Sequence, residues 1–207
     1  MVKVKICGIT NVGDALLVCN YGTDFLGIVV DVPHTPRSIT KEQAKKIISI
    51  LPESVTTVVV TIPNNIKEVK EIEKKVQPDV IQIHSNLDLS DLNSECKIIQ
   101  TIHVSSDAVK LSKKIEPNVD FILLDTKTNI PGGSGILNDL ETCSKVVKEV
   151  EKPVILAGGL NPRNIEEAIE IVRPYAVDVS SGVESYPGKK DPKKIKDFIR
   201  KVRRCGS

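Results

Sequence analysis

Short runs of apolar, mostly β-branched residues alternate along the whole chain with longer stretches typical of helices. We predict strands over residues 2–7, 25–31, 56–61, 80–84, 97–102, 121–125, 154–157 and 176–180. Helices are predicted to begin near Asn11, Thr40, Asn64, Asp107, Asn138, Pro162 and Pro192. The segment 87–94 is too short for more than a turn or two of helix.

Two of the predicted helices carry recognisable start signals. Thr40 and Gln43 have the spacing of a capping box, in which each side chain bonds the other residue's backbone N–H. Pro162 follows Asn161, which places proline near the first helical turn, where its missing N–H costs least.

The repeated strand–helix unit predicts the fold class. Eight strands and roughly eight helices, with about 26 residues per unit, are typical of a small (β/α)8 barrel. No linker or low-complexity segment divides the sequence, so we predict one barrel domain over residues 1–207. An open, doubly wound sheet is the alternative, although eight parallel units in so short a chain favour closure.

Alternation along the strands indicates which side chains face the barrel interior. Val2, Val4 and Ile6 form one apolar face of the first strand, so Lys5 and Cys7 belong to the other. The same parity on four more strands leaves a polar inward residue at each carboxyl end. The residues predicted to meet at the mouth of the barrel are Cys7, Asp31, Gln82, His84, Asp125, Asp178 and Ser180. Any one of them could be a cap or a satisfied polar group, but seven together predict a site.

Glycine-rich loops suggest what this site binds. "LAGGLNPRN" follows the seventh strand and "DVSSGVE" follows the eighth, where barrels commonly bind phosphate through backbone N–H groups. A single Gly-Gly pair is more often a tight turn, but two such loops at these strand ends predict a phosphate site. Its predicted residues are Gly158, Gly159, Ser181 and Gly182. A third glycine-rich stretch, "NIPGGSGIL", is predicted to close over the substrate.

Composition narrows the possible partners. No apolar run is long enough to cross a bilayer, which argues against a membrane protein. A net charge of +2 and 3% aromatic residues leave neither a basic patch nor a stacking platform, so no nucleic-acid partner is predicted. The 5 cysteines are widely spaced without a CxxC pair, which predicts free thiols in a reducing cytoplasm. His84 and His103 lack the neighbouring ligands that a metal site needs, so no metal is predicted.

The sequence resembles the phosphoribosylanthranilate isomerases of tryptophan biosynthesis from end to end. The matching segments are "KICGIT", "TPR", "QIH", "LLDT…GGSG", "LAGGLNPRN" and "VDVSSGVESYPGKKD". The resemblance implies a cofactor-free Amadori rearrangement of N-(5-phosphoribosyl)anthranilate, a small-molecule substrate, to the corresponding 1-deoxyribulose 5-phosphate. It also implies that Asp125 is the general acid, that Cys7 is the general base and that Arg37 binds the anthranilate carboxylate. Gln82, His84 and Asp178 are expected to bind substrate, in a chain that is a monomer or a homodimer.

Elementary chemistry agrees with this assignment. A thiol titrates near ~8.5, close enough to neutrality for a general base if its pKa is slightly lowered, and inward-facing Lys5 could supply the cation that lowers it. Gly8 is expected to leave room for the sugar. As an acid, Asp125 needs a raised pKa, from enclosure or from Asp178; pairing structurally with Lys5 is its competing role.

The sequence leaves two alternative functions, a histidine-pathway isomerase and a non-catalytic barrel. The histidine-pathway isomerases perform the same rearrangement on a related aminoribosyl phosphate, but they resemble duplicated half-barrels with two phosphate loops and an aspartate at the end of the first strand. Here that position is Cys7, and "IPNN" and "SN" follow the third and fourth strands. A non-catalytic sugar-phosphate-binding barrel would need neither Cys7 nor Asp125.

Overall fold

The computed structural model describes residues 1–125 and 140–205 of the chain. The strands in these ranges are β1 (Lys3–Ile6), β2 (Phe25–Val30), β3 (Ser38–Ile39), β4 (Thr56–Thr61), β5 (Val80–Ile83), β6 (Lys97–His103), β7 (Phe121–Asp125), β8 (Val154–Leu156), β9 (Ala176–Val179), β10 (Glu184–Tyr186) and β11 (Lys189–Lys190). The α-helices are α1 (Val12–Asn20), α2 (Lys41–Ile48), α3 (Ile66–Val76), α4 (Ala108–Ile115), α5 (Leu140–Glu149), α6 (Ile165–Val172) and α7 (Pro192–Cys205). Two 3-10 turns, η1 (Glu116–Asn118) and η2 (Ser181–Val183), complete the described elements.

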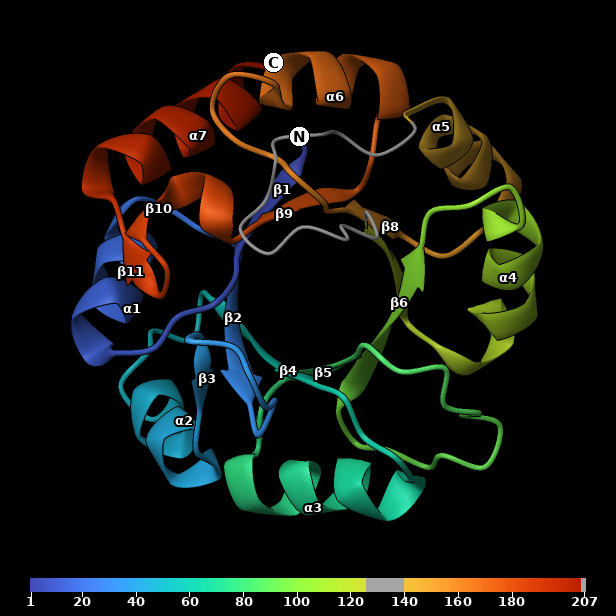
Figure 1. Cartoon of the computed structure of the whole chain (residues 1–207), viewed down its shortest axis with the longest axis horizontal. Helices are drawn as coiled ribbons and strands as arrows, with labels where there is room; N and C mark the ends of the chain where they lie inside the picture. The colour runs from blue at the N-terminus through green and yellow to red at the C-terminus, as the bar shows by residue number, and fades with distance from the viewer. Residues whose placement is uncertain (126–139, 206–207) are drawn as a thin grey trace.

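The main sheet is a closed parallel barrel surrounded by helices (Figure 1). Its strands follow the order β1-β9-β8-β7-β6-β5-β4-β2, and β1 also pairs with β2, where Lys5 is opposite Phe25. This last pairing closes the ring. The predicted (β/α)8 barrel is therefore confirmed, and the open doubly wound alternative is wrong.

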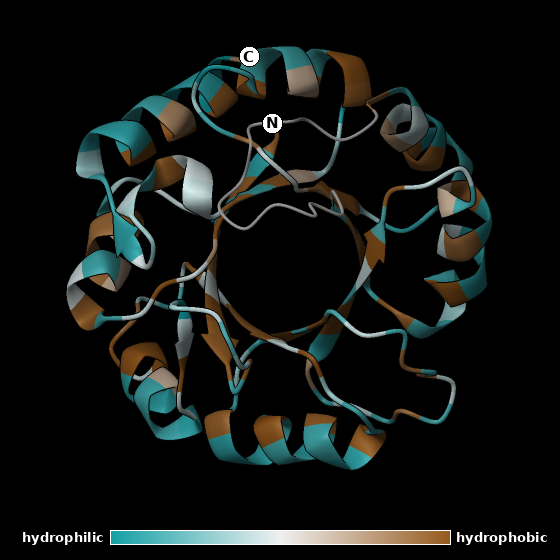
Figure 2. Cartoon of the chain, in the orientation of Figure 1, coloured by the Kyte–Doolittle hydropathy of each residue, from teal (hydrophilic) through white to brown (hydrophobic). Residues whose placement is uncertain are grey.

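Side chains alternate between two hydrophobic layers, as the sequence pattern predicted. Val4, Ile6, Leu26 and Ile28 belong to the outer cluster, which packs between the strands and the helices. The helices present their hydrophobic side to the strands and their polar side outward, most clearly at α3 (Figure 2). The inner cluster fills the barrel interior and consists of Cys7, Phe25, Val58, Val60, Val80, Ile99, Phe121, Leu123, Ile155, Ala157 and Ala176.

Aromatic side chains fill the amino-terminal end of the barrel interior. Phe25 and Phe121 stand at the first positions of β2 and β7 and meet edge to face, with ring centroids 6.3 Å apart. Tyr175, just before β9, lies 5.8 Å from Phe121 by the same measure. With this end filled, a ligand can enter the interior only from the carboxyl ends of the strands.

All eight predicted barrel strands are present, and most of the predicted helix starts are close. The Thr40 and Gln43 capping box is formed by reciprocal bonds of 2.9 and 3.2 Å. The start predicted near Asn138 lies outside the described residues. The start predicted near Pro162 is wrong, because α6 begins at Ile165. Asn161 instead accepts a bond from the Arg163 N–H and forms a turn ahead of the helix.

Roughly eight helices were expected around the barrel, but a loop takes the place of a helix between β5 and β6. Residues 84–96 contain no helix, as the short segment 87–94 suggested. Buried Leu89 covers the barrel there, and the Gln100 side chain donates a 3.0 Å bond to the backbone oxygen of Leu87. A loop tied down by such a bond can replace a helix where little apolar surface needs covering.

Sequence patterning missed two small additions to the barrel. Strand β3 pairs with β2 at Val29 and Val30, beyond the positions where β2 pairs with β1, and β10 and β11 form a separate antiparallel hairpin before α7. Elements of two or three residues are too short for a hydrophobic period to be read from sequence. Within the described ranges, no helix is long and apolar enough to span a bilayer.

Candidate active site

A pocket of about 390 Å³ lies at the carboxyl ends of the barrel strands. Ten of the twelve residues that the sequence placed in the site line it, namely Cys7, Arg37, Gln82, His84, Asp125, Gly158, Gly159, Asp178, Ser180 and Ser181. Strands far apart in the chain therefore bring these side chains together as the parity argument predicted.

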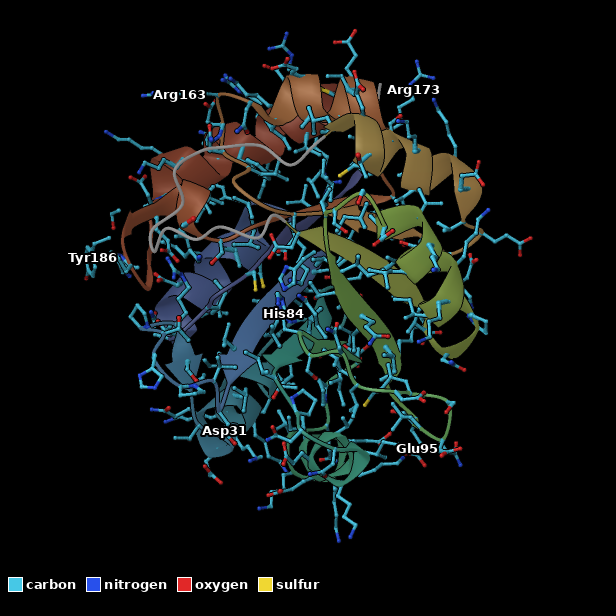
Figure 3. All side chains as sticks on the ribbon, turned by 45° about the vertical axis from the view of Figure 1, so that its right-hand side comes forward. Asp31, His84, Glu95, Arg163, Arg173 and Tyr186 are labelled. Carbon is cyan, nitrogen blue, oxygen red and sulfur yellow. The ribbon has the colours of Figure 1, made fainter. Side chains whose placement is uncertain are left out.

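Asp31 does not belong to this group, which corrects one prediction. It directly follows β2 with a positive φ of 53°, is exposed, and forms an ion pair with Lys41 at the start of α2. The left-handed backbone turns the chain away from the strand direction, so strand alternation no longer applies at this position. Figure 3 shows His84 at the centre of the barrel and Asp31 at its periphery.

Cys7 directly follows β1 and is almost fully buried in the pocket floor. Its N–H donates a 2.9 Å bond to the Val179 backbone oxygen, which fixes the thiol beside β9. Space for the sulfur comes from Gly27 on the neighbouring strand, since a Cβ there would lie 2.7 Å from Cys7 Sγ. The backbone thus leaves a side-chain-sized space that the thiol fills.

The space beside Gly8 is used differently from our expectation. Gly8 has a φ of +76°, which L-residues rarely adopt, and a Cβ there would lie 2.8 Å from both Arg37 Cδ and Ser180 Oγ. The missing side chain therefore admits Arg37 and Ser180 next to the thiol. The expectation that it leaves room for the sugar is not what the packing shows.

A buried ion pair lies next to the thiol. Lys5 Nζ and Asp178 Oδ2 are 2.8 Å apart, and the lysine side chain is completely buried. Burial alone would lower the pKa of Lys5, but Asp178 and Cys7 raise it above its ordinary value, so Lys5 is charged. Lys5 therefore pairs with Asp178, whereas the sequence had suggested Asp125 as its structural partner.

The pKa of Cys7 is raised, contrary to the expectation from sequence. Burial raises it most, and the negative charge of Asp178 raises it further. Lys5 and Lys190 both act to lower it, as predicted for Lys5, but they do not outweigh burial. The thiol is consequently protonated in the free protein at neutral pH.

Gln82 and His84 form the polar wall on β5 and just beyond it. Gln82 Nε2 lies 2.8 Å from His84 Nε2 and 3.3 Å from Thr101 Oγ1. Burial, together with the positive charge of Lys5 and the neighbouring His103, lowers the pKa of His84 to about 4. A neutral ring can accept the Gln82 bond at Nε2 and carry its proton at Nδ1.

Three polar atoms around the pocket lack a hydrogen-bond partner among the described residues. They are Gln82 Oε1, Asp178 Oδ1 and Ser180 Oγ, each buried. A buried polar atom without a partner is costly, and native structures usually pair it with water or ligand. Two of the three are acceptors only, so they suit the hydroxyl groups of a sugar.

The two glycine loops approach each other beside these atoms. Gly158 and Gly159 have φ angles of 93° and 66°, and the side-chain amides of Asn161 and Asn164 hold the Gly159 carbonyl. A Cβ at Gly182 would lie 2.0 Å from the Leu160 backbone oxygen, so only glycine permits this contact. Gly182 itself lines an adjoining hollow with Lys193 and Lys194 rather than the pocket.

The N–H groups of these loops are available for an anion. Among the described residues, the N–H groups of Gly158, Gly159, Ser181 and Gly182 donate to no protein acceptor. Several free N–H groups converging from two loops are typical of phosphate sites. The stretch "NIPGGSGIL", predicted to cover the substrate, lies outside the described residues.

Asp125 ends β7 on the rim of the pocket and is half-buried, across the barrel from β2. A carboxyl group and a thiol in one pocket can move protons at two positions of a single bound molecule. In the part of the chain that the structure describes, no three His, Cys, Asp or Glu side chains are placed to hold a metal ion. The pocket is thus suited to proton transfer on a phosphorylated ligand.

Sequence reasoning missed one residue of the site. Arg37 is bound by Glu184, the first residue of the β10–β11 hairpin, through bonds of 2.9 Å from Nε and 2.6 Å from Nη2. The only signal in the sequence was the Pro187-Gly188 pair, which is typical of a turn. It gives no indication that Glu184 points toward Arg37.

Comparison with known proteins agrees with this geometry. The family model for N-(5'-phosphoribosyl)anthranilate (PRA) isomerase matches residues 4–201. The isomerase of Methanocella arvoryzae is 42% identical, over 98% of this chain and 99% of its own length. The crystal structure of the Thermotoga maritima isomerase superimposes with a TM-score of 0.89 at 37% identity, covering 98% of this chain and 99% of that one.

A further solved relative contains a ligand. It is described as phosphoribosylanthranilate isomerase in complex with reduced 1-(o-carboxyphenylamino)-1-deoxyribulose 5-phosphate, and it superimposes with a TM-score of 0.85 at 34% identity, covering 98% of this chain and 99% of that one. The match of the family model to nearly the whole chain, together with these full-length relatives, shows that the chain belongs to the phosphoribosylanthranilate isomerase family.

Proposed function

We propose that Cys7 and Asp125 carry out the reaction of this phosphoribosylanthranilate isomerase, which rearranges N-(5-phosphoribosyl)anthranilate to 1-(2-carboxyphenylamino)-1-deoxyribulose 5-phosphate in tryptophan biosynthesis. The single observation that carries the assignment is that a thiol and a carboxyl group share one pocket with free loop N–H groups and a guanidinium. The loop N–H groups would bind the phosphate, the thiol and the carboxyl group would transfer protons at the sugar, and the guanidinium would bind the anthranilate carboxylate.

The proposed chemistry needs two proton transfers. Asp125, acting as an acid, protonates the ribose ring oxygen, so the C1′–O bond breaks and the nitrogen forms an iminium with C1′. Cys7, acting as a base, removes the proton from C2′, and the electron pair left behind forms the C1′–C2′ double bond of an enol amine. Protonation at C1′ with loss of the enol proton then gives the ketone, and atoms and electrons balance without a cofactor.

The raised pKa of Cys7 has two opposite consequences for this step. A thiolate with a raised pKa is a stronger base toward a carbon acid, which favours removal of the C2′ proton. The same rise lowers the fraction of thiolate at neutral pH. Lys5 and Lys190 limit this loss, because their positive charges favour the thiolate.

The lining of the pocket supports one orientation of the substrate. Phosphate would bind at the loops after β8 and β9, where the free N–H groups of Gly159 and Ser181 lie. The ring of anthranilate would lie on the opposite, apolar side formed by Val32 and Ile62, with its carboxylate at Arg37. The unpartnered oxygens of Gln82 and Asp178, and the neutral His84, would face the sugar hydroxyls between them.

Local structure argues against the histidine-pathway alternative, which needs a second phosphate site across the barrel. The amino terminus of α3 after β4 is already occupied, since Asn65 Oδ1 accepts from the Glu68 N–H at 3.1 Å. The Glu68 carboxylate in turn accepts from the Asn64 N–H at 2.9 Å. A carboxylate at this helix end repels phosphate.

A spectroscopic assay with freshly generated phosphoribosylanthranilate tests the proposal. We expect turnover by the wild-type chain and turnover slower by at least about 100-fold by C7A or D125N. Turnover of the histidine-pathway intermediate without turnover of phosphoribosylanthranilate would contradict the assignment. Binding of the product analogue without turnover of either substrate would favour the non-catalytic barrel.

We infer that the chain is a cytoplasmic, single-domain protein over residues 1–207, as the sequence predicted. Its cysteines are all free, which is typical of a reducing compartment. The monomer or homodimer predicted from sequence stays a prediction; one Thermotoga maritima structure is described as monomers generated from a dimeric isomerase.

A further inference from the structure

Glu184 is a buried carboxylate outside the pocket that contacts a residue lining it. Its side chain is 3% exposed, and its two oxygens accept separate bonds from Nε and Nη2 of Arg37. Such a two-point bond fixes the plane of a guanidinium as well as its distance. Arg37 has five N–H donors and uses two here, and among the described residues its side chain makes no other bond.

Lys190, at the other end of the hairpin, holds Glu184 in place. Its buried Nζ donates to Glu184 Oε1 at 2.9 Å and to the Ser180 backbone oxygen at 3.2 Å. Burial lowers the pKa of Lys190, while Glu184 opposes that shift. The carboxylate is therefore held between two cations, and their opposite charges keep the pKa of Glu184 below its ordinary value despite burial.

The hairpin that carries this pair is itself fastened to the barrel. The Lys190 N–H donates to Asp14 Oδ2 on α1 at 3.1 Å, and Thr10 Oγ1 donates to the Gly188 backbone oxygen at 3.0 Å. Lys194 Nζ on α7 donates to the Glu184 backbone oxygen at 2.6 Å. Bonds from three segments thus leave Glu184 little freedom to move.

On the other side of Arg37, packing limits the movement of its side chain. A Cβ at Gly8 would lie 2.8 Å from Arg37 Cδ, so the arginine stem occupies the space that the glycine leaves. The guanidinium is held between this contact and Glu184. Its remaining three donors are therefore oriented before a ligand arrives.

We propose that Glu184, held by Lys190, is a positioning residue that presents Arg37 to the carboxylate of the anthranilate ring. This inference rests on the role of Arg37 given under the proposed function. An arginine already held in its bound orientation loses less conformational freedom on binding. Arg37, Glu184 and Lys190 also sum to one positive charge, which a bound carboxylate neutralises.

The test compares two ligands in calorimetric binding experiments. One is reduced 1-(o-carboxyphenylamino)-1-deoxyribulose 5-phosphate, and the other is the same molecule without the ring carboxylate. For E184Q we expect the carboxylate-bearing ligand to bind about 10- to 100-fold more weakly, because the amide cannot accept both Arg37 bonds. Binding of the ligand without the carboxylate should change by less than about 3-fold.

A double-mutant cycle separates positioning from a general effect on the fold. R37A/E184Q should bind the carboxylate-bearing ligand no more weakly than R37A, since Glu184 acts through Arg37. E170Q, which removes an exposed carboxylate from α6, is the matched control and should behave as wild type. If E184Q folds poorly because Lys190 loses its partner, E184Q/K190M removes that charge and should show the same selective loss.

The outcomes distinguish this inference from the one on which it rests. If R37A weakens both ligands equally, the role proposed for Arg37 is wrong. If R37A is selective for the carboxylate-bearing ligand but E184Q is not, Arg37 is a carboxylate ligand that Glu184 does not position. Equal weakening of both ligands by E184Q and by E184Q/K190M would show that the pair only stabilises the hairpin.

Discussion

Lys5 and Asp178 form a buried ion pair, 2.8 Å from nitrogen to oxygen, beside the thiol of Cys7. The two residues belong to adjacent strands and are direct partners in the β1–β9 register. Their charges act on Cys7 in opposite directions, since Lys5 favours the thiolate and Asp178 opposes it. Lys190 adds a second charge that favours the thiolate, but burial has the largest effect and determines the direction of the pKa shift.

The first prediction concerns the thiolate population of Cys7. Because its pKa is raised, the thiolate fraction should grow about tenfold per pH unit from pH 7 to 9. Inactivation by iodoacetamide should follow the same slope, measured in a variant with Cys19, Cys96, Cys143 and Cys205 replaced so that only one thiol reacts. Phosphate-bearing ligands should protect. A plateau in rate below pH 8 would show that the pKa is lowered instead.

A second prediction tests the ion pair directly. D178N removes the charge that raises the pKa of Cys7 and leaves Lys5 to lower it, so alkylation at pH 7 should become faster. The same change leaves a buried lysine without its counter-charge and should lower the free energy of unfolding by roughly 3–5 kcal/mol. D79N is the control, because Asp79 bonds Thr57 at the far end of the barrel. It should leave the alkylation rate unchanged.

The proton-transfer roles make a third prediction. C7S and D125N should each lower kcat by about 10²–10⁴-fold with little change in KM, because each group acts on a proton rather than on binding. A serine hydroxyl is far too weakly acidic to exist as the anion. Steady-state kinetics with phosphoribosylanthranilate provide the measurement. Wild-type turnover by C7S would contradict the prediction and show that Cys7 has only a packing role.

Gly27 allows a steric test of the same thiol. A Cβ in G27A would lie 2.7 Å from Cys7 Sγ and 3.0 Å from its Cα, so the thiol and its backbone must move. Displacement of a reacting group by about 1 Å can lower kcat by about 100-fold, and overpacking should cost roughly 1–3 kcal/mol of stability. G22A is the control for kcat, since a Cβ at Gly22 would have no neighbour within 4 Å, although its φ of +84° makes any side chain there strained. Equal kcat in both variants would contradict this account.

The last prediction concerns stability and pH. The pKa of His84 is about 4 in the folded protein against 6.5 for the free side chain, so the unfolded chain binds the extra proton between these values. His84 therefore contributes stability above pH 6.5 that is lost as pH falls towards 4, by up to roughly 3 kcal/mol. Urea unfolding at pH 7 and 4.5 should show a smaller pH dependence in H84Q than in wild type. An identical pH dependence would mean that His84 is charged in the fold.

Periodicity by itself determined the barrel and most of its mouth. Alternation along β1, β5, β7 and β9 was enough to place Cys7, Gln82, Asp125 and Asp178 in one pocket, because parallel strands of a closed sheet end on the same side. Alternation is a property of each strand by itself and does not depend on how the strands pack. It was wrong for Asp31, where a positive φ ends the alternation.

Tertiary structure alone decided the charges around the thiol and the orientation of Arg37. The pKa of Cys7 depends on burial and on cations from β1 and β11, which are 185 positions apart at Lys5 and Lys190. The Arg37–Glu184 pair joins residues 147 positions apart through a hairpin of two short strands. Electrostatics and hydrogen bonds depend on distance in space, and no hydrophobic period encodes which distant residues become neighbours.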